Sequence, residues 1–191
     1  MVVPQVTIER VFVLGIDPGL SRCGYGCVRS DGPHRHAIAA GVITPAVDES
    51  VPVRLAVLRG ELHQLVGELH PDVVVVERVF FQTNARTAMS VGQASGVALL
   101  TAVELGCEVV EYTSNEVKLA VTGFGGATKD QVQRMVAKLL NLGTVPKPAD
   151  AADALALALC HLSTASWARA SWREPAVSKA PRGQVSPVAP R

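Results

Sequence analysis

Four acidic side chains are placed where carboxylates often take part in chemistry, at the ends of predicted elements. Asp17 and Glu77 each end a short, almost entirely apolar run, which predicts a buried strand before each of them. Asp150 and Asp153 are spaced i, i+3 in a segment that is otherwise nearly all Ala and Leu. They therefore share one face of a predicted packed helix. Two strand ends and one helix face are predicted to supply the four carboxylates.

Each of these acids also has an ordinary structural explanation. Asp17 precedes Pro18 and Gly19, which form a turn signal. Carboxylates in the first turn of a helix are stabilised by its dipole without any further role. These explanations are weaker for the four acids taken together. Neighbouring strands lie only about 4.8 Å apart, so acids at the ends of two such strands would lie close to each other. Four carboxylates that meet at one place repel one another by roughly a few kcal/mol per pair.

Such a cluster favours hard divalent cations. Mg²⁺ takes oxygen ligands and suits a few carboxylates together with a substrate phosphate. Two ions about 4 Å apart activate a water molecule and stabilise the leaving oxygen in phosphodiester hydrolysis. Residues 1–163 contain 13 basic and 16 acidic side chains. Two Mg²⁺ ions would change that balance from −3 to about +1, so that a polyanion can enter an acidic cleft.

The remaining pattern predicts the α/β domain that would position these side chains. Strands are predicted over residues 11–17, 23–29, 36–43, 73–77 and 109–112. Helices are predicted over residues 53–69 and 84–105, and after Thr113, Thr128 and Pro148, the first two of which open capping boxes. We expect a mixed five-stranded sheet with helices on both faces, in which the first and fourth strands are parallel neighbours. The carboxyl ends of its strands are then the expected site.

Composition excludes several other classes of protein. The chain has 191 residues, of which 48% are hydrophobic and 4% aromatic. It can therefore bury an Ala, Val and Leu core without disulfide support. Its four cysteines do not make a disulfide scaffold, and Cys23 and Cys27 have no second pair to complete a zinc site. No signal peptide is present, so the cytoplasm is expected. The uncharged run between Arg86 and Glu104 predicts a buried helix, with no membrane span.

The charge is unevenly distributed along the chain. Residues 164–191 contain five basic side chains and one acid, and they are rich in Ala, Ser and Pro. We expect one domain over residues 1–163 and a mobile basic tail over residues 164–191. Two interpretations of the tail stay open, an inert terminus and a weak electrostatic arm.

Several motifs together resemble the RuvC family of Holliday-junction resolvases. They are Gly15-Ile-Asp-Pro-Gly19, Gly24-Tyr-Gly26, Val76-Glu-Arg-Val-Phe80, Gly92-Gln-Ala94, Val117-Lys118 and Pro148-Ala-Asp-Ala-Ala-Asp-Ala-Leu-Ala156. The resemblance runs in order from about residue 11 to residue 163. It implies a ribonuclease-H-like fold and a homodimer. It also implies Mg²⁺- or Mn²⁺-dependent nicking of two opposed strands at a four-way DNA junction, giving 5′-phosphate and 3′-hydroxyl ends.

The resemblance assigns roles to individual residues. Asp17, Glu77, Asp150 and Asp153 become the catalytic and metal-binding acids, around two ions per site. Some family members carry His at the position of Asp150, whereas this chain keeps an acid. Partnership with a RuvA–RuvB branch-migration complex is implied by the family only.

Candidate DNA-binding residues follow from local charge and exposure. Lys118 and Lys129 flank a glycine-rich loop in a segment with a local charge of +3, where phosphate contact is expected. Phe80 and Phe81 directly follow the Glu77 strand, and the resemblance selects Phe80 for stacking on an unpaired base. Phe81 has core packing as an alternative. Arg78 either contacts backbone phosphate or pairs with an acid.

Small residues mark the candidate dimer interface. Ala88, Gly92 and Gly96 recur every fourth position on one predicted helix and permit close approach of a second helix. A junction with near two-fold symmetry requires two related active sites, which a C2 dimer supplies. The alternative is that this face packs on the chain's own sheet.

Two other classes of function remain as alternatives. An actin-like ATPase or kinase also opens on a Gly-Ile-Asp turn, but it needs a second domain for which 191 residues leave no room. A non-catalytic junction- or nucleic-acid-binding module would have no need of four intact acids.

Overall fold

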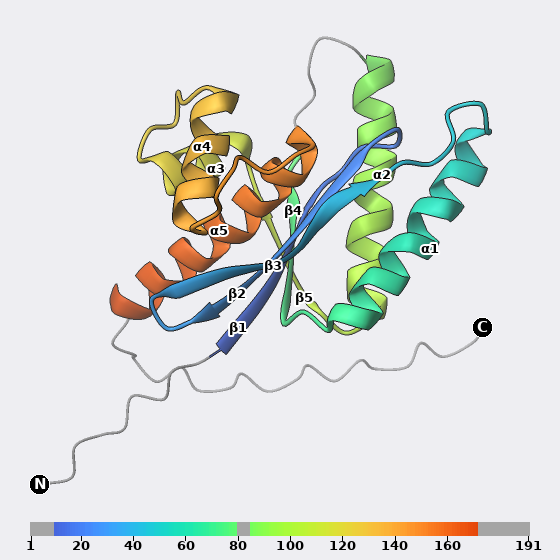
Figure 1. Cartoon of the computed structure of the whole chain (residues 1–191). Coiled ribbons are helices and arrows are strands. Elements are labelled where there is room, and N and C mark those ends of the chain that lie inside the picture. Colours follow the sequence, from blue (N-terminus) through green and yellow to red (C-terminus); the bar gives the residue numbers. More distant parts are fainter. Residues whose placement is uncertain (1–9, 80–84, 172–191) are drawn as a thin grey trace, which may run out of the picture.

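The computed structural model describes residues 10–79 and 85–171, which form a five-stranded mixed sheet between two layers of helices (Figure 1). The strands are β1 (Arg10–Asp17), β2 (Cys23–Asp31), β3 (His34–Ile43), β4 (Val73–Glu77) and β5 (Glu108–Tyr112). Their order in the sheet is β3-β2-β1-β4-β5. The first three strands are antiparallel, and β4 pairs in parallel with both β1 and β5. The predicted meander and the parallel pairing of the first and fourth strands are confirmed.

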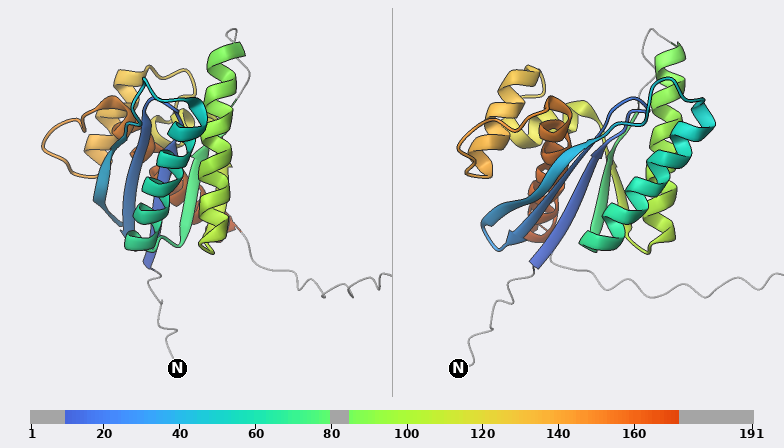
Figure 2. Two further views of the ribbon diagram at one scale, coloured as in Figure 1. Left: turned by 90° about the vertical axis from the view of Figure 1, so that its right-hand side faces the viewer. Right: turned by 45° about the vertical axis from the view of Figure 1, so that its right-hand side comes forward.

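Helices cover the two faces separately (Figures 1 and 2). The helices are α1 (Val51–Leu69), α2 (Ala85–Glu104), α3 (Ser114–Thr122), α4 (Lys129–Leu139) and α5 (Ala149–Ser171). One core lies between the sheet and α1 and α2, and the other lies between the sheet and α3, α4 and α5. Figure 2 shows α1 and α2 side by side on one face, with α5 crossing the opposite face.

The alternation of side chains along the central strands directs the two strand-end acids to one face. Val13 of β1 and Val75 of β4 lie in the core that α3, α4 and α5 cover, whereas Leu14 lies in the core on the opposite face. Side chains alternate with a period of two, so Asp17 and Glu77 belong to the same face as Val13 and Val75. Both acids therefore end their strands on the side where α5 packs.

Glycines on that face allow α5 to lie unusually close to the sheet. A Cβ atom built on Gly15 or Gly24 would overlap the backbone carbonyl of Ala154 or of Asp150, respectively. At Gly26 the same atom would lie 2.6 Å from the backbone nitrogen of Leu155. Only glycine fits at these positions, and the close approach brings the first turns of α5 beside the end of β1.

Capping residues start the two short helices where the sequence predicts them. The Thr113 hydroxyl accepts a hydrogen bond from the Glu116 N–H at 3.2 Å, and Glu116 accepts one from the Thr113 N–H at 2.7 Å. Thr128 and Gln131 make the equivalent pair of bonds at 3.3 and 2.8 Å. Each box satisfies two N–H groups that a helix start leaves unpaired. Both predicted capping boxes are confirmed.

Two features differ from the expectations. The last helix continues to Ser171, past the expected domain boundary at residue 163, while residues 172–191 lie outside the described part of the chain. The second helix is not buried all round, because Met89, Leu100 and Val103 are exposed.

Within the described residues, no helix is long and apolar enough to cross a membrane. The thiols of Cys23 and Cys27 lie in the core under α1 and α2, and burial raises the pKa of each to about 12.

Candidate active site

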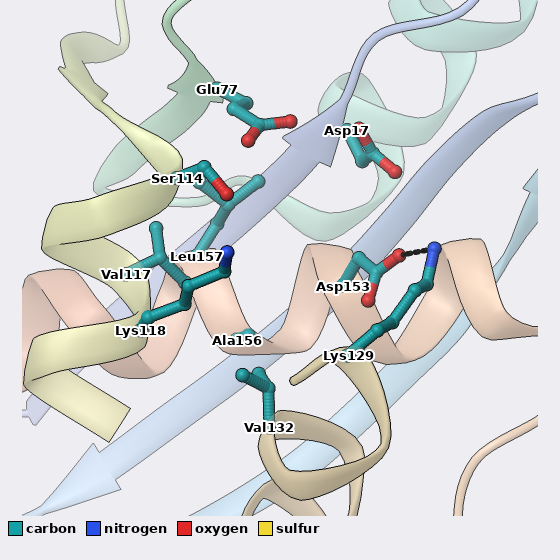
Figure 3. Close-up of a pocket in the computed structure, with 10 residues that line it drawn as sticks. All are labelled: Asp17, Glu77, Ser114, Val117, Lys118, Lys129, Val132, Asp153, Ala156 and Leu157. Carbon is teal, nitrogen blue, oxygen red and sulfur yellow. Dashed lines mark ion pairs between the residues drawn. The ribbon is translucent and has the colours of Figure 1, made fainter. Parts of the chain in front are cut away.

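Three of the four predicted acids line one pocket of about 350 Å³ at the carboxyl ends of β1 and β4 (Figure 3). Asp17 ends β1, Glu77 ends β4, and Asp153 projects from the second turn of α5. Residues just before the two strand ends, Ile16 and Val76, are register partners. The parallel pairing therefore brings the two strand-end carboxylates together, and the docking of α5 adds the third.

The electrostatics of the pocket show that these carboxylates are crowded. The pKa of Asp17 is raised from 3.8 to about 7, first by burial and then by the negative charges of Glu77 and Asp153. Burial is also the main cause of the raised pKa of Glu77, which the nearby Ser114 hydroxyl partly offsets. Two neighbouring carboxylates with raised pKa values indicate a site that favours positive charge.

Basic side chains hold the two acids of α5. The ammonium of Lys129 lies 2.5 Å from Oδ2 of Asp153, and this contact is the main cause of the raised pKa of Lys129. The guanidinium of Arg22 donates to Oδ2 of Asp150 from Nε at 3.0 Å and from Nη2 at 2.8 Å. Asp150 does not line the pocket that the other three acids share. The expectation that four carboxylates share one pocket is thus met by three, with the fourth held beside it.

The donor set fits a hard divalent cation in its chemistry. Carboxylate oxygens are the ligands that Mg²⁺ and Mn²⁺ prefer, and the crowding at Asp17 and Glu77 is the condition that a cation relieves. Across residues 10–79 and 85–171, no three His, Cys, Asp or Glu side chains are oriented to hold one metal ion together. One carboxylate oxygen of Asp150 and one of Asp153 are held in ion pairs with basic side chains.

Of the basic residues predicted to bind DNA, two lie at the pocket. Lys118 on α3 and Lys129 at the start of α4 both line it, and Figure 3 shows the Lys118 ammonium pointing inwards. No ion pair joins Lys118 to an acid anywhere in the described structure. Arg78 is exposed outside the pocket; the pKa of Glu116 is lowered mainly by the hydrogen bond from the Thr113 N–H, and the charge of Arg78 adds a smaller contribution. Phe80 and Phe81 lie outside the described residues.

The residues proposed for a dimer interface lie on the outer side of α2. Ala88 is half-buried, while Gly92 and Gly96 are exposed, with no neighbouring atom within 4 Å of a Cβ built on either glycine. The face that packs on the sheet is instead formed by Ala94, Ala98 and Ala102. The alternative that the Gly92 face packs on the chain's own sheet is therefore wrong.

Sequence reasoning missed two residues of the site. Ser114 lines the pocket and favours the charged form of Glu77, and its place beside the capping Thr113 after a strand was an available signal. Arg22 pairs with Asp150, 128 positions away along the chain. A basic residue in the turn after Asp17 was visible, but its partner depends on how α5 packs.

A mixed sheet in this order, with acids at the ends of β1 and β4 and on the last helix, defines the ribonuclease-H-like nuclease class. A family model described as crossover junction endodeoxyribonuclease RuvC matches residues 13–161. The curated protein of that name from Salinispora arenicola is 53% identical over 78% of this chain and 86% of its own length. Its counterpart from Syntrophomonas wolfei is 46% identical over 88% of this chain and 96% of its own. The chain therefore belongs to the RuvC family of crossover junction endodeoxyribonucleases.

Solved structures agree with this assignment. A Thermus thermophilus RuvC structure determined in complex with a Holliday junction substrate superposes with a TM-score of 0.78 and 34% identity. The superposition covers 82% of this chain and 96% of that one. The yeast mitochondrial Holliday junction resolvase has a TM-score of 0.58 at 14% identity, which indicates a shared fold.

Proposed function

We propose that this chain resolves four-way DNA junctions by hydrolysing phosphodiester bonds in two opposed strands. The observation that carries the proposal is the pocket in which Asp17, Glu77 and Asp153 converge beside Lys118 and Lys129. Family membership says what kind of substrate to expect, and a relative has been solved with a Holliday junction. The acids needed for hydrolysis are all retained, which favours an enzyme over a non-catalytic binding module.

Each residue of the pocket has a part that its position supports. Asp17, Glu77, Asp150 and Asp153 would hold the divalent cations, and Asp17 would be central to the set because the negative charges of Glu77 and Asp153 both act on it. When bound, Mg²⁺ or Mn²⁺ ions supply an activated water and stabilise the leaving oxygen, giving 5′-phosphate and 3′-hydroxyl ends.

The lysines act on the DNA rather than on the water. Lys118 is half-buried, and its ammonium points into the pocket and has no acidic partner in the described structure, so it is free to contact the scissile or a neighbouring phosphate. Lys129 holds Asp153 and also lines the pocket, which places it to exchange its carboxylate partner for a phosphate. Phosphate contacts of this kind position the backbone without reading sequence.

A homodimer completes the proposal, since two opposed strands require two sites. The outer side of α2 carries Met89, Gly92, Gly96, Leu100 and Val103, at successive spacings of three, four, four and three. All five are exposed, and such spacing forms one stripe along a helix. Two glycines in the middle of an apolar stripe permit close approach of the same helix from a second copy, as in a C2 contact.

Membership of the RuvC family also supports a proposal for the cellular compartment and the protein partner. We place the protein in the cytoplasm, where its four free thiols stay reduced. A RuvA–RuvB branch-migration complex is the proposed partner, and co-purification of the full chain with those two proteins on junction DNA tests it.

A cleavage assay tests the proposed function. A synthetic four-way junction and a linear duplex carrying the sequence of one of its arms are incubated with the full chain, with and without Mg²⁺ or Mn²⁺. We expect symmetric nicks in the junction only when the metal is present, and little cutting of the duplex. Equal cutting of both substrates would replace junction resolution by a general nuclease activity. Cutting in the presence of a chelator would remove the metal from the account.

A further inference from the structure

Arg22 lies in the short turn between β1 and β2, and the surrounding structure fixes its position. Arg54 of α1 donates hydrogen bonds to the Leu20 carbonyl at 3.1 Å and to the Ser21 hydroxyl at 2.9 Å. Leu20 and Cys23, on either side of Arg22, are buried in the core. The turn is therefore held from α1, and its arginine is presented to the N-terminal end of α5.

Asp150 is held just as firmly on the other side of the contact. Its backbone lies directly over Gly24, where even a methyl group would not fit. The Arg22 guanidinium directs two N–H groups at the same oxygen of Asp150. Burial alone would raise the pKa of this carboxyl, but hydrogen bonds from Arg22 and from the backbone, together with the charges of Arg22 and Lys129, outweigh it and leave the pKa below 3.8. The Arg22–Asp150 pair is thus a contact between two charged side chains whose backbones, in the β1–β2 turn and at the start of α5, are both held in place.

The contact occupies the carboxylate that the metal chemistry needs. Asp17, Glu77 and Asp153 line the pocket, while the Asp150 oxygen is turned onto Arg22. A guanidinium and a divalent cation cannot both take this oxygen at close range without strong repulsion between them. Cation binding through Oδ2 of Asp150 therefore requires that Arg22 be displaced, and binding through Oδ1 would place two positive charges on one carboxylate.

We propose that Arg22 is a positioning residue that competes with the divalent cation for the carboxylate of Asp150. This inference rests on the proposed function, because it assumes that Asp150 is a cation ligand. Arg22 lowers the cation affinity of the free protein by occupying the ligand. Once displaced, its guanidinium, which is half exposed beside the cleft, is available to a phosphate of the bound DNA.

Calorimetric titration of the full chain with MnCl₂ and with MgCl₂ tests this competition. The variants are Arg22→Ala and Arg22→Gln, the latter keeping a hydrogen-bond donor without the charge. A matched control is Arg59→Ala, which breaks the Arg59–Glu104 pair, whose 2.7 Å contact and half-exposed arginine resemble the Arg22 pair. Melting temperatures in a chelator confirm that each variant is folded.

We expect both Arg22 variants to bind the cation about two- to five-fold more tightly than the wild type, a size set by partly exposed ion pairs. The cation-induced rise in melting temperature should be larger in the same two variants, and Arg59→Ala should match the wild type. Unchanged or weaker cation binding in both Arg22 variants overturns the competition while leaving the metal site in place. A wild type that binds neither cation overturns the metal site itself, and this inference with it.

Discussion

The pKa of Asp17 lies at about 7 because the side chain is buried and faces Glu77 and Asp153. In the unfolded chain the same carboxyl titrates near 3.8. A carboxyl whose pKa is raised by folding stabilises the fold below its unfolded pKa, and that contribution is lost as the pH rises through the folded pKa. The window for Asp17 therefore runs from about pH 4 to about pH 7. Above it, without metal, the charged acid is a cost to the fold.

Asp17→Asn should therefore stabilise the protein in the presence of a chelator. At pH 8 we expect a gain of roughly 1–3 kcal/mol, or about 2–4 °C in melting temperature for each kcal/mol in a chain of this size. The gain should shrink at pH 5, where the wild-type carboxyl is mostly protonated. Thermal melts at both pH values measure it, with the exposed Asp48→Asn as control. A variant less stable than the wild type at pH 8 would contradict the crowding.

Lys118→Ala tests the proposed phosphate contact. A charge-assisted hydrogen bond to phosphate contributes roughly 1.5–3 kcal/mol, so junction binding or cleavage should weaken by about 10- to 100-fold. Lys118→Arg should recover part of the loss, and the melting temperature should stay within a few degrees of the wild type. The control is Lys138→Ala, an exposed residue of α4 outside the pocket. If Lys118→Ala binds and cleaves the junction like the wild type, Lys118 makes no contact with phosphate that matters for the reaction.

At the scale of elements, the packing of α5 decides where two of the four acids lie. The helix approaches β1 and β2 over three glycines, and its N-terminal turns follow from that contact. A side chain added at one of these glycines would push α5 away from the sheet and displace the acids that it carries. The same glycines sit in motifs that also resemble ordinary turn and strand sequences, so their role is visible only in three dimensions.

Gly24→Ala should disturb the site through α5. The added methyl group would overlap the Asp150 backbone, and overpacking of this kind costs roughly 1–3 kcal/mol. We expect a lower melting temperature and a loss of cleavage larger than the loss of stability explains. Gly67→Ala is the matched control, since Gly67 lies in α1 with open space around it and should stabilise by about 0.5–1 kcal/mol. Full cleavage activity in Gly24→Ala would contradict the role of close packing.

Local signals predicted the elements well, whereas long-range contacts were not predictable. The capping boxes at Thr113 and Thr128 depend on residues three apart, and both helices begin there. The strand ends at Asp17 and Glu77 follow from short apolar runs, and the parallel pairing follows from the order of elements. The Arg22–Asp150 pair joins residues 128 positions apart and could not be predicted. Likewise, the continuation of α5 past residue 163 could not be predicted, because the sequence there shows no apolar periodicity.

At the scale of the whole molecule, the proposed reaction needs two copies of the chain. The two-fold symmetry of a four-way junction matches two pockets related by a C2 axis. The outer stripe of α2 is apolar, exposed and interrupted by glycines, and β3 lies at the far edge of the sheet. Substitutions on the outer stripe of α2 and on the edge strand β3 should therefore affect dimer formation differently.

Leu100→Glu should convert a dimer into a monomer. Leu100 is 56% exposed on α2, and a charge there would be buried between two copies. Light scattering after gel filtration should give twice the 20.1 kDa chain mass for the wild type and a single mass for the variant. Ile38→Glu, at a 43% exposed position on β3, should remain dimeric. A dimeric Leu100→Glu, or dissociation by Ile38→Glu alone, would move the interface elsewhere.

The most direct measurement is single-turnover nicking of a four-way junction whose opposed strands carry different labels, with wild type and Asp17→Asn compared in Mg²⁺. Junction binding by both proteins is measured in parallel. The account predicts that the wild type nicks both labelled strands. Asp17→Asn should bind the junction within a few-fold of the wild type and nick at least about 10³-fold more slowly, a loss of about 4 kcal/mol. Nicking by Asp17→Asn at the wild-type rate would contradict the claim that the carboxylates of this pocket carry the reaction.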